Sequence, residues 1–168
     1  MNIFILDKSP SISAHYLCDK HVPKMTLESA QLLACALIEN NCPSHEMPVT
    51  KSGTRYKGGY KHHPCAVWAG KSVGNYIWLC NHALELTREF YNRYGKVHAC
   101  TEPILVMCEL SEYLPEGELT EFVQAMPDEY KNKDAVKAYR EYYNKDKNQF
   151  AQWKLGRAQP QWYNGSNR

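Results

Sequence analysis

The fold of this chain is constrained most by two long stretches in which apolar residues recur every three or four positions. The first covers residues 25–38; the second begins at Pro64 and ends near Tyr94, where Gly95 predicts a helix stop. There is little strand signal and no internal repeat. At 168 residues and 43% hydrophobic content, the sequence predicts an all-α protein: a mostly helical single domain spanning residues 1–168.

Local signals place the remaining elements. Residues 2–6 are either a short edge strand or an extended lead-in segment. Ser9 and Pro10 predict a helix start, and the helical region then runs to about Asn40, bent or interrupted at Pro23. We expect a helix over residues 103–114, then a loop with one turn, a last helix from Asp134 through Tyr139, Tyr143, Phe150 and Trp153, and a tail with Trp162 and Tyr163 packed back.

Several protein classes are disfavoured. No apolar run approaches the roughly 20 residues that span a bilayer, and residues 1–7 lack the basic start of a signal peptide. The seven cysteines are scattered without a Cys-x-x-Cys pair, which is typical of reduced core residues in a cytosolic protein. We therefore expect a cytoplasmic protein; its oligomeric state stays open.

The net charge of +2 hides a strong separation along the chain. Residues 102–129 contain eight of the 18 acidic residues and no Lys or Arg, so the remainder carries 20 basic and ten acidic residues. Such a chain can present a basic face to a polyanion. The alternative is that the acidic and basic segments neutralise each other in the fold.

The first long helix carries a narrow polar strip formed by His21, Lys24, Glu28 and Gln31. At 100° per residue these positions fall within an arc of about 80°. A base, an amine, a carboxylate and an amide on one strip indicate a functional face. The structural alternative is an exposed ion pair between Lys24 and Glu28 four residues apart.

A basic loop over residues 51–63 leads into the second helical stretch. It combines four permanent cations, two tyrosines and three glycines with no acidic residue. Flexible backbone, cations and aromatic rings suit phosphate contact and base stacking. The loop ends in His62-His63-Pro64 and continues to Trp68, which brings imidazole groups next to it.

Other chemistries have weaker support. Cys18, Asp19, His21, His62 and His63 could bind a metal, but adjacent histidines diverge and zinc sites favour spaced pairs. No motif indicates a catalytic triad or a nucleotide phosphate loop. The sequence therefore predicts neither a metal nor a cofactor. What remains is an amine, a carboxylate and an imidazole, which suit excision of a base from DNA through an imine with the sugar.

The order Lys24-x-x-x-Glu28-x-x-Gln31-Leu32-Leu33, a basic loop and His63-Pro64-x-x-x-Trp68 resembles the pyrimidine-dimer DNA glycosylase (endonuclease V-like) family, and within it the bacterial and phage branch. The resemblance covers about residues 1–95. It implies a helical protein that kinks duplex DNA, flips a nucleotide and nicks by glycosylase and lyase chemistry.

The resemblance also implies that an N-terminal α-amine is the nucleophile, freed by removal of the initiator Met. Because Asn2 disfavours that removal, we expect Met1 to stay. Lys20-His21-Val22-Pro23-Lys24 matches the family's Arg-Glu-Leu-Pro-Arg stretch, with His21 in place of the glutamate. Glu28 is then the candidate to take over the role of that carboxylate.

The expected function is a DNA glycosylase and lyase acting on a damaged or modified pyrimidine. The alternatives are a nucleotide- or base-modifying enzyme on the same scaffold, and a non-catalytic nucleic-acid-binding protein. The candidate catalytic residues are Lys24, Glu28, His21, His63 and Met1. The expected partner is duplex DNA, bound through its backbone by the basic loop and neighbouring side chains: Lys20, Gln31, Arg55, Lys57, Tyr60, Lys61, His62 and Trp68.

Overall fold

The structure, a computed structural model, describes residues 1–165. This part of the chain contains helices and no strand, which confirms the all-α prediction; one isolated bridge joins Val49 and Arg55. None of the helices in these residues is both long and apolar enough to cross a membrane. The elements are α1 (Pro10–Tyr16), α2 (His21–Glu39), α3 (Pro64–Gly70), α4 (Val73–Tyr94), α5 (Thr101–Cys108), the 3₁₀ turns η1 (Ser111–Tyr113) and η2 (Asp128–Tyr130), and α6 (Ala135–Asp146).

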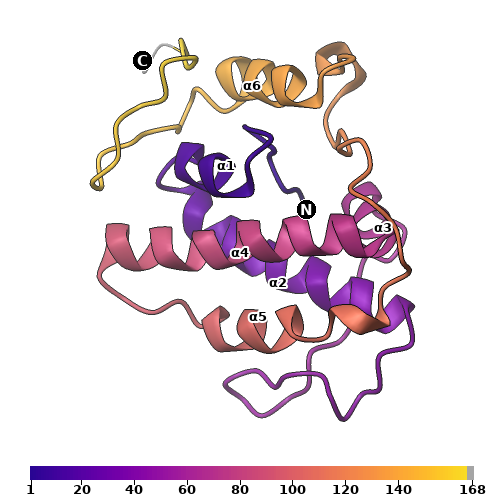
Figure 1. Cartoon of the computed structure of the whole chain (residues 1–168). Coiled ribbons are helices and arrows are strands. Elements are labelled where there is room, and N and C mark those ends of the chain that lie inside the picture. Colours follow the sequence, from indigo (N-terminus) through magenta and orange to yellow (C-terminus); the bar gives the residue numbers. More distant parts are fainter. Residues whose placement is uncertain (166–168) are drawn as a thin grey trace.

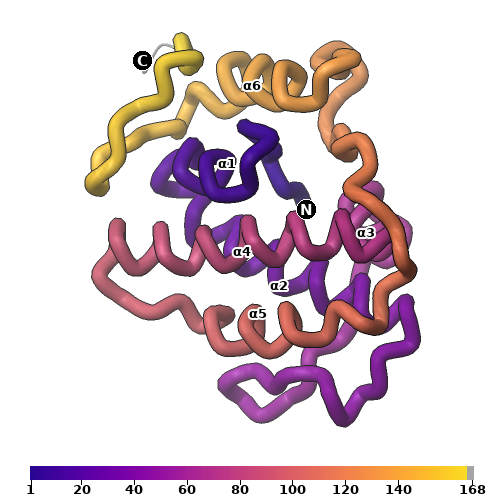
Figure 2. Tube along the Cα trace, in the orientation of Figure 1, coloured from indigo at the N-terminus to yellow at the C-terminus, as the bar shows by residue number. Residues whose placement is uncertain are grey.

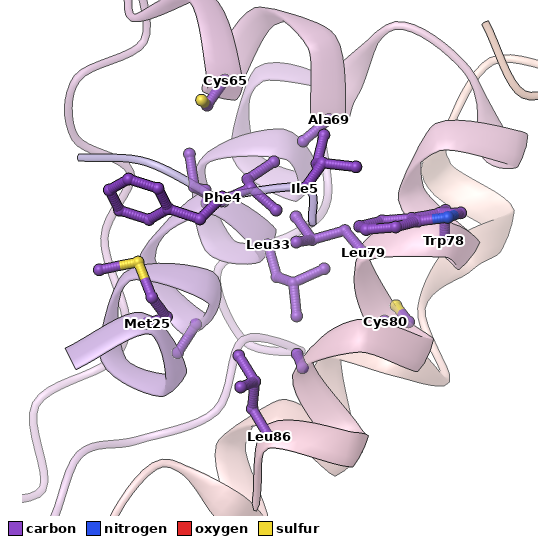
Figure 3. Packing of buried hydrophobic residues seen from close by; sticks show 14 of the residues in the cluster. Phe4, Ile5, Met25, Leu33, Cys65, Ala69, Trp78, Leu79, Cys80 and Leu86 are labelled. Atoms are coloured by element: carbon purple, nitrogen blue, oxygen red, sulfur yellow. The ribbon is translucent and has the colours of Figure 1, made fainter. Parts of the chain in front are cut away.

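The core lies between α2 and α4, the two longest helices. Helix α4 crosses the middle of the molecule and packs against α1, α2, α3 and α5 (Figure 1). Residues 3–6 are buried without forming a strand, so the extended alternative holds for the N-terminal segment. Figure 3 shows Phe4 and Ile5 among core side chains of α2, α3 and α4, including Leu33, Ala69 and Leu79.

Helix ends follow the local sequence signals. The Ser9 hydroxyl accepts from the Ile12 N–H with Pro10 at the first helical position, and the Asp134 carboxylate caps α6. Gly95 ends α4 with φ +65°, a left-handed conformation that glycine adopts without steric cost. Pro23 lies in the first turn of α2, where the missing N–H removes no helical hydrogen bond.

Both long helical predictions are interrupted in the structure. The first breaks at residues 17–20, between α1 and α2, and not at Pro23. The second breaks at Lys71 and Ser72, because the Ser72 hydroxyl caps a new helix by accepting from the Asn75 N–H. Helix α5 ends at Cys108 and α6 at Asp146, so both are shorter than predicted.

The segment that follows η1, residues 115–127, is called the strap below. It has no regular secondary structure and passes from η1 along α4 and α3 to η2 and α6 (Figures 1 and 2). Its backbone satisfies the free N–H groups at the start of α4: Val73 N–H donates to the Pro115 carbonyl (2.8 Å) and Gly74 N–H to the Gly117 carbonyl (3.0 Å). The predicted loop with one turn is confirmed.

The C-terminal tail packs on the corner between α1 and α2. The Asp19 carboxylate accepts from the Lys154 N–H (2.7 Å) and from Arg93 (3.1 Å), and Arg157 pairs with the buried Glu89. Tyr163 is buried, as predicted for the docked tail. All seven cysteines are free thiols and all but Cys108 are buried, which confirms their role as reduced core residues.

Candidate active site

Glu28 meets the start of the chain. The Asn2 backbone N–H donates to Glu28 Oε2 at 2.7 Å, and Lys24 Nζ lies 3.9 Å from Glu28 Oε1. The predicted Lys24–Glu28 pair is therefore present. The two side chains differ in environment: Lys24 is 63% exposed and Glu28 only 13%. A half-enclosed carboxylate thus faces the N-terminal residues, with a solvated ammonium group at its edge.

The Asn2 side chain fixes the residues around it. Its Oδ1 accepts from the Ile3 N–H (2.7 Å) and the Phe4 N–H (3.1 Å), and its Nδ2 donates to the Ala125 carbonyl (2.7 Å). Phe4 has φ +55°, a conformation that is rare for a bulky residue and is sustained by surrounding packing. The first residues of the chain are therefore held in one conformation against Glu28.

His63, the residue that caps the start of α3, lies near Glu28 and the N-terminus. Its Nδ1 accepts from the Cys65 N–H (3.1 Å), so the proton of the neutral ring is on Nε2. Burial lowers the pKa of His63; the nearby N-terminal amine lowers it further, while the Glu28 carboxylate acts in the opposite direction. Amine, carboxylate and imidazole are close enough for their charges to interact, as expected for His63 beside the Glu28 face.

The expected position of His21 in the exposed strip is wrong. His21 does face the N-terminal segment, as Glu28 does, but Phe4 stacks on its ring at 4.6 Å and Tyr143 of α6 hydrogen-bonds its Nδ1 at 2.6 Å. Only 3% of the residue is exposed. Burial and the charges of Lys147, Lys24 and Lys20 lower its pKa to about 3. Helical spacing predicts on which face of the helix a residue lies. It does not predict which distant segments of the chain will cover that face.

The basic loop runs along α2 towards this site. Gly58 lies against Cys35 and Ile38 of α2, and the loop then reaches His63. Its polar members Lys57, Lys61 and His62 are exposed, and Tyr60 is 72% exposed with φ +58°. Arg55 donates to the Met47 carbonyl (2.7 Å), so part of its guanidinium binds the loop itself.

The remaining predicted contact residues are divided between surface and core. Lys20 is exposed above the Phe150 ring and Gln31 is partly exposed on α2. Trp68 lies in the core, contrary to its expected contact with nucleic acid: it is 5% exposed and its indole N–H donates to the Glu121 carbonyl (2.9 Å). Packing of α3 against α4 and the strap explains the difference, because Trp78 and Phe122 cover its ring.

A separate cluster joins His15, Glu85 and Glu89, whose ligand atoms lie within 4.8 Å of one another. His15 Nε2 is 2.7 Å from Glu85, and the buried Glu89 is bound by Arg93 and Arg157. Two guanidinium groups on the central carboxylate satisfy its charge, so this cluster joins α1, α4 and the tail as an ion-pair network. It uses none of the residues first considered as metal ligands.

The sequence matches the profile of one known protein family. The sequence profile described as pyrimidine dimer DNA glycosylase matches residues 1–102. The chain belongs to this family. The matched residues include the N-terminal segment, Glu28, the basic loop and His63, and they end at the start of α5. Searches of curated proteins and of solved structures give no match.

Membership in a DNA glycosylase family indicates an enzyme of DNA repair with DNA as its substrate. Sequence reasoning placed Glu28, Lys24, His63 and Met1 together and missed Asn2 and the strap. Asn2 had a local signal, because an asparagine side chain often accepts from backbone N–H groups one or two residues ahead. The strap had none, because the Ala125 contact uses a backbone carbonyl 123 residues away.

Proposed function

We propose that this protein is a DNA glycosylase with lyase activity, which removes a damaged pyrimidine through an imine between the deoxyribose and the amine at the start of the chain. The family match suggests a pyrimidine dimer as the lesion. The observation that carries the proposal is the 2.7 Å hydrogen bond from the Asn2 nitrogen to the half-enclosed Glu28 carboxylate. In the chain that keeps Met1, this nitrogen belongs to the peptide bond next to the α-amine, so the hydrogen bond holds that amine one residue away from Glu28.

The structure favours this amine over Lys24. A lysine becomes nucleophilic when it is desolvated or set beside another cation. Lys24 is instead well exposed and its nearest charged partner is a carboxylate, which favours the protonated form. α-Amines as a class have ordinary pKa values more than two units below those of lysine side chains.

In the proposed reaction, the α-amine, Glu28 and His63 account for the nucleophile and for the proton transfers. The amine lone pair attacks C1′, the C1′–N1 bond breaks, and its electron pair leaves with the base, which takes up a proton. Glu28 accepts the proton lost by the amine, and His63 supplies a neutral N–H donor beside the reacting atoms. Opening of the sugar breaks the C1′–O4′ bond and forms the C=N bond. Loss of a C2′ proton then expels the 3′ phosphate.

The basic loop supports duplex binding in this proposal. Lys57, Lys61 and His62 are exposed on the loop that approaches His63 along α2. Cations at these positions can neutralise backbone phosphates on either side of the extruded nucleotide. Tyr60, exposed between them, can stack on an unpaired base.

The test is borohydride trapping on duplex DNA that contains a pyrimidine dimer, followed by peptide mapping of the adduct. We expect the wild type to be trapped through its first residue. Glu28→Gln should slow trapping by roughly 10²–10⁴-fold. Glu39→Gln, an exposed position at the end of the same helix, serves as the matched control and should behave as the wild type.

A second comparison distinguishes the α-amine from the Lys24 amine as the nucleophile. N-terminal acetylation should abolish trapping, whereas Lys24→Ala should leave it within a few fold. Normal cleavage by both forms, or no cleavage by the wild type, excludes imine chemistry at this site. Salt-insensitive binding of free nucleotides would then favour a nucleotide-modifying enzyme, and DNA binding without any reaction would favour a binding protein.

A further inference from the structure

The strap is attached to the helices along its whole length. The Ser72 hydroxyl donates to the Glu118 carbonyl (2.9 Å), and the Asn75 side chain bonds the Thr120 N–H (2.8 Å) and hydroxyl (2.9 Å). The Trp68 indole N–H then donates to the Glu121 carbonyl. These contacts start at the beginning of α4 and lead directly to the residues beside Asn2.

Tyr139 of α6 makes the last attachment before Asn2. Its hydroxyl donates to the Val123 carbonyl (2.9 Å) and accepts from the Ala125 N–H (3.1 Å). The Ala125 carbonyl in turn accepts from Asn2 Nδ2 (2.7 Å). One buried hydroxyl therefore fixes both sides of Val123–Ala125, and through Ala125 it fixes Asn2.

The position of Asn2 decides where the reacting amine lies. The Asn2 amide has two attachments, its Nδ2 to Ala125 and its Oδ1 to the Ile3 and Phe4 N–H groups. The adjacent backbone nitrogen bonds Glu28. Without the Ala125 contact, the asparagine keeps only bonds within its own segment, and nothing in the strap orients it towards Glu28.

We infer that the strap, through Tyr139, Ala125 and Asn2, is a positioning device for the amine at the start of the chain. The inference rests on the proposed imine chemistry. Tyr139 and the strap lie beyond residues 1–102, the part of the chain that the family profile matches. The C-terminal third of this protein therefore completes an active site whose reacting groups all come from the first 63 residues.

The experiment compares two matched variants. Tyr139→Phe removes the hydroxyl that holds the strap. Tyr143→Phe, at a fully buried tyrosine of the same helix, removes a hydroxyl that bonds Cys18 and His21 and does not touch the strap. Dimer-containing DNA is used at saturation, and both the trapping rate and the Kd are measured.

Tyr139→Phe should slow trapping by about ten- to a hundredfold with an unchanged Kd, because a misplaced nucleophile loses rate and not binding. Tyr143→Phe should retain the wild-type rate, even if both variants lose similar stability. Asn2→Asp has the same size and also disfavours removal of Met1. Its carboxylate can still accept from the Phe4 N–H but cannot donate to the Ala125 carbonyl, so this variant should reproduce the Tyr139→Phe defect.

Hydrogen exchange gives a readout that does not require activity. The amides of residues 3–6 should exchange faster in Tyr139→Phe than in the wild type or Tyr143→Phe. Unchanged exchange, or equal trapping rates for wild type, Tyr139→Phe and Asn2→Asp, would overturn the positioning role. A wild type that is never trapped refutes the proposed chemistry instead, and the exchange result then shows by itself whether the strap orders residues 1–6.

Discussion

At the residue scale, two buried histidines are held uncharged by their surroundings. His21 hydrogen-bonds Tyr143 and stacks on Phe4, and burial is the largest cause that lowers its pKa to about 3. His82 bonds the Pro10 carbonyl and stacks on Trp78; burial lowers its pKa to about 4. Both values lie below the ordinary value of 6.5, so the unfolded chain takes up these protons first.

These histidines predict a loss of stability in mild acid. Because the unfolded state binds more protons below pH 6.5, the contribution of these two histidines to the free energy of unfolding should fall from there and be fully lost near pH 3–4. Each histidine contributes a slope of about 1.4 kcal/mol per pH unit. Urea unfolding at pH 7, 6 and 5 measures it.

Two variants test whether the buried histidines cause this pH dependence of stability. His82→Gln retains an N–H donor for Pro10 and should remove the share of His82, about 1.4 kcal/mol per pH unit, whereas His45→Gln removes an exposed imidazole and should leave the dependence intact. Equal stability of the wild type at pH 7 and pH 5 would show that neither buried ring resists protonation.

At the scale of elements, the strap and α4 are in direct backbone contact at Gly74. A β-carbon at this position would lie 2.3 Å from the Leu119 nitrogen and 2.4 Å from the Glu118 carbonyl carbon. Neither backbone atom can rotate away as a side-chain tip could. Glycine is therefore required here for close approach, although its sequence context in a helix gives no sign of it.

Gly74→Ala should accordingly destabilise the protein by about 1–3 kcal/mol, the usual cost of overpacking. Urea unfolding of the variant against the wild type gives the difference. Gly59→Ala is the control, because nothing lies within 4 Å of the β-carbon it would add. A Gly74→Ala variant as stable as the wild type would mean that the strap does not pack on α4 in this way.

The basic loop gives a prediction about DNA affinity. Replacing Lys57 and Lys61 by Ala should weaken binding and reduce the slope of log K against log salt by about two, roughly one for each lost phosphate contact. Arg55 should contribute less, because it already binds the Met47 carbonyl. Lys133→Ala, a cation beyond the strap, should leave the slope unchanged; an unchanged slope for the loop variant would place the DNA elsewhere.

Helix ends with local signals, such as Ser9, Gly95 and Asp134, are readable from sequence because the capping groups are neighbours in the chain. The break at Lys71 and Ser72 is not, since carbonyls of Pro115 and Gly117 help to complete the new helix start. Glu28, Lys24 and His63 could be grouped by helical spacing and by the order of motifs. The burial of His21 and Trp68 could not, because α6 and the strap cover them from more than 50 residues away.

At the scale of the whole molecule, the charge separation persists in three dimensions. Among the acidic residues at positions 102–129, the one ion pair within the described part of the chain joins Asp128 to Lys131. Direct pairing with the basic segments therefore does not neutralise them. The exposed carboxylates of Glu116, Glu118 and Glu121 lie on the strap, and four of the cations, Lys51, Arg55, Lys57 and Lys61, lie on the loop that contacts α2. A polyanion that approaches the site over the loop therefore meets exposed cations without acidic neighbours in the loop sequence.

The long-range bonds of the N-terminal segment also set the order in which the protein can mature. A ribosome makes Asn2 and His21 first and reaches Ala125 and Tyr143 only after the last third of the chain has begun. Until then Asn2 can bond Glu28 but lacks its contact with the strap, and His21 lacks its hydrogen bond to Tyr143. The amine that starts synthesis thus acquires its full set of neighbouring contacts only near the end of synthesis, and a chain interrupted after the family-matched residues would lack the contact between Asn2 and Ala125.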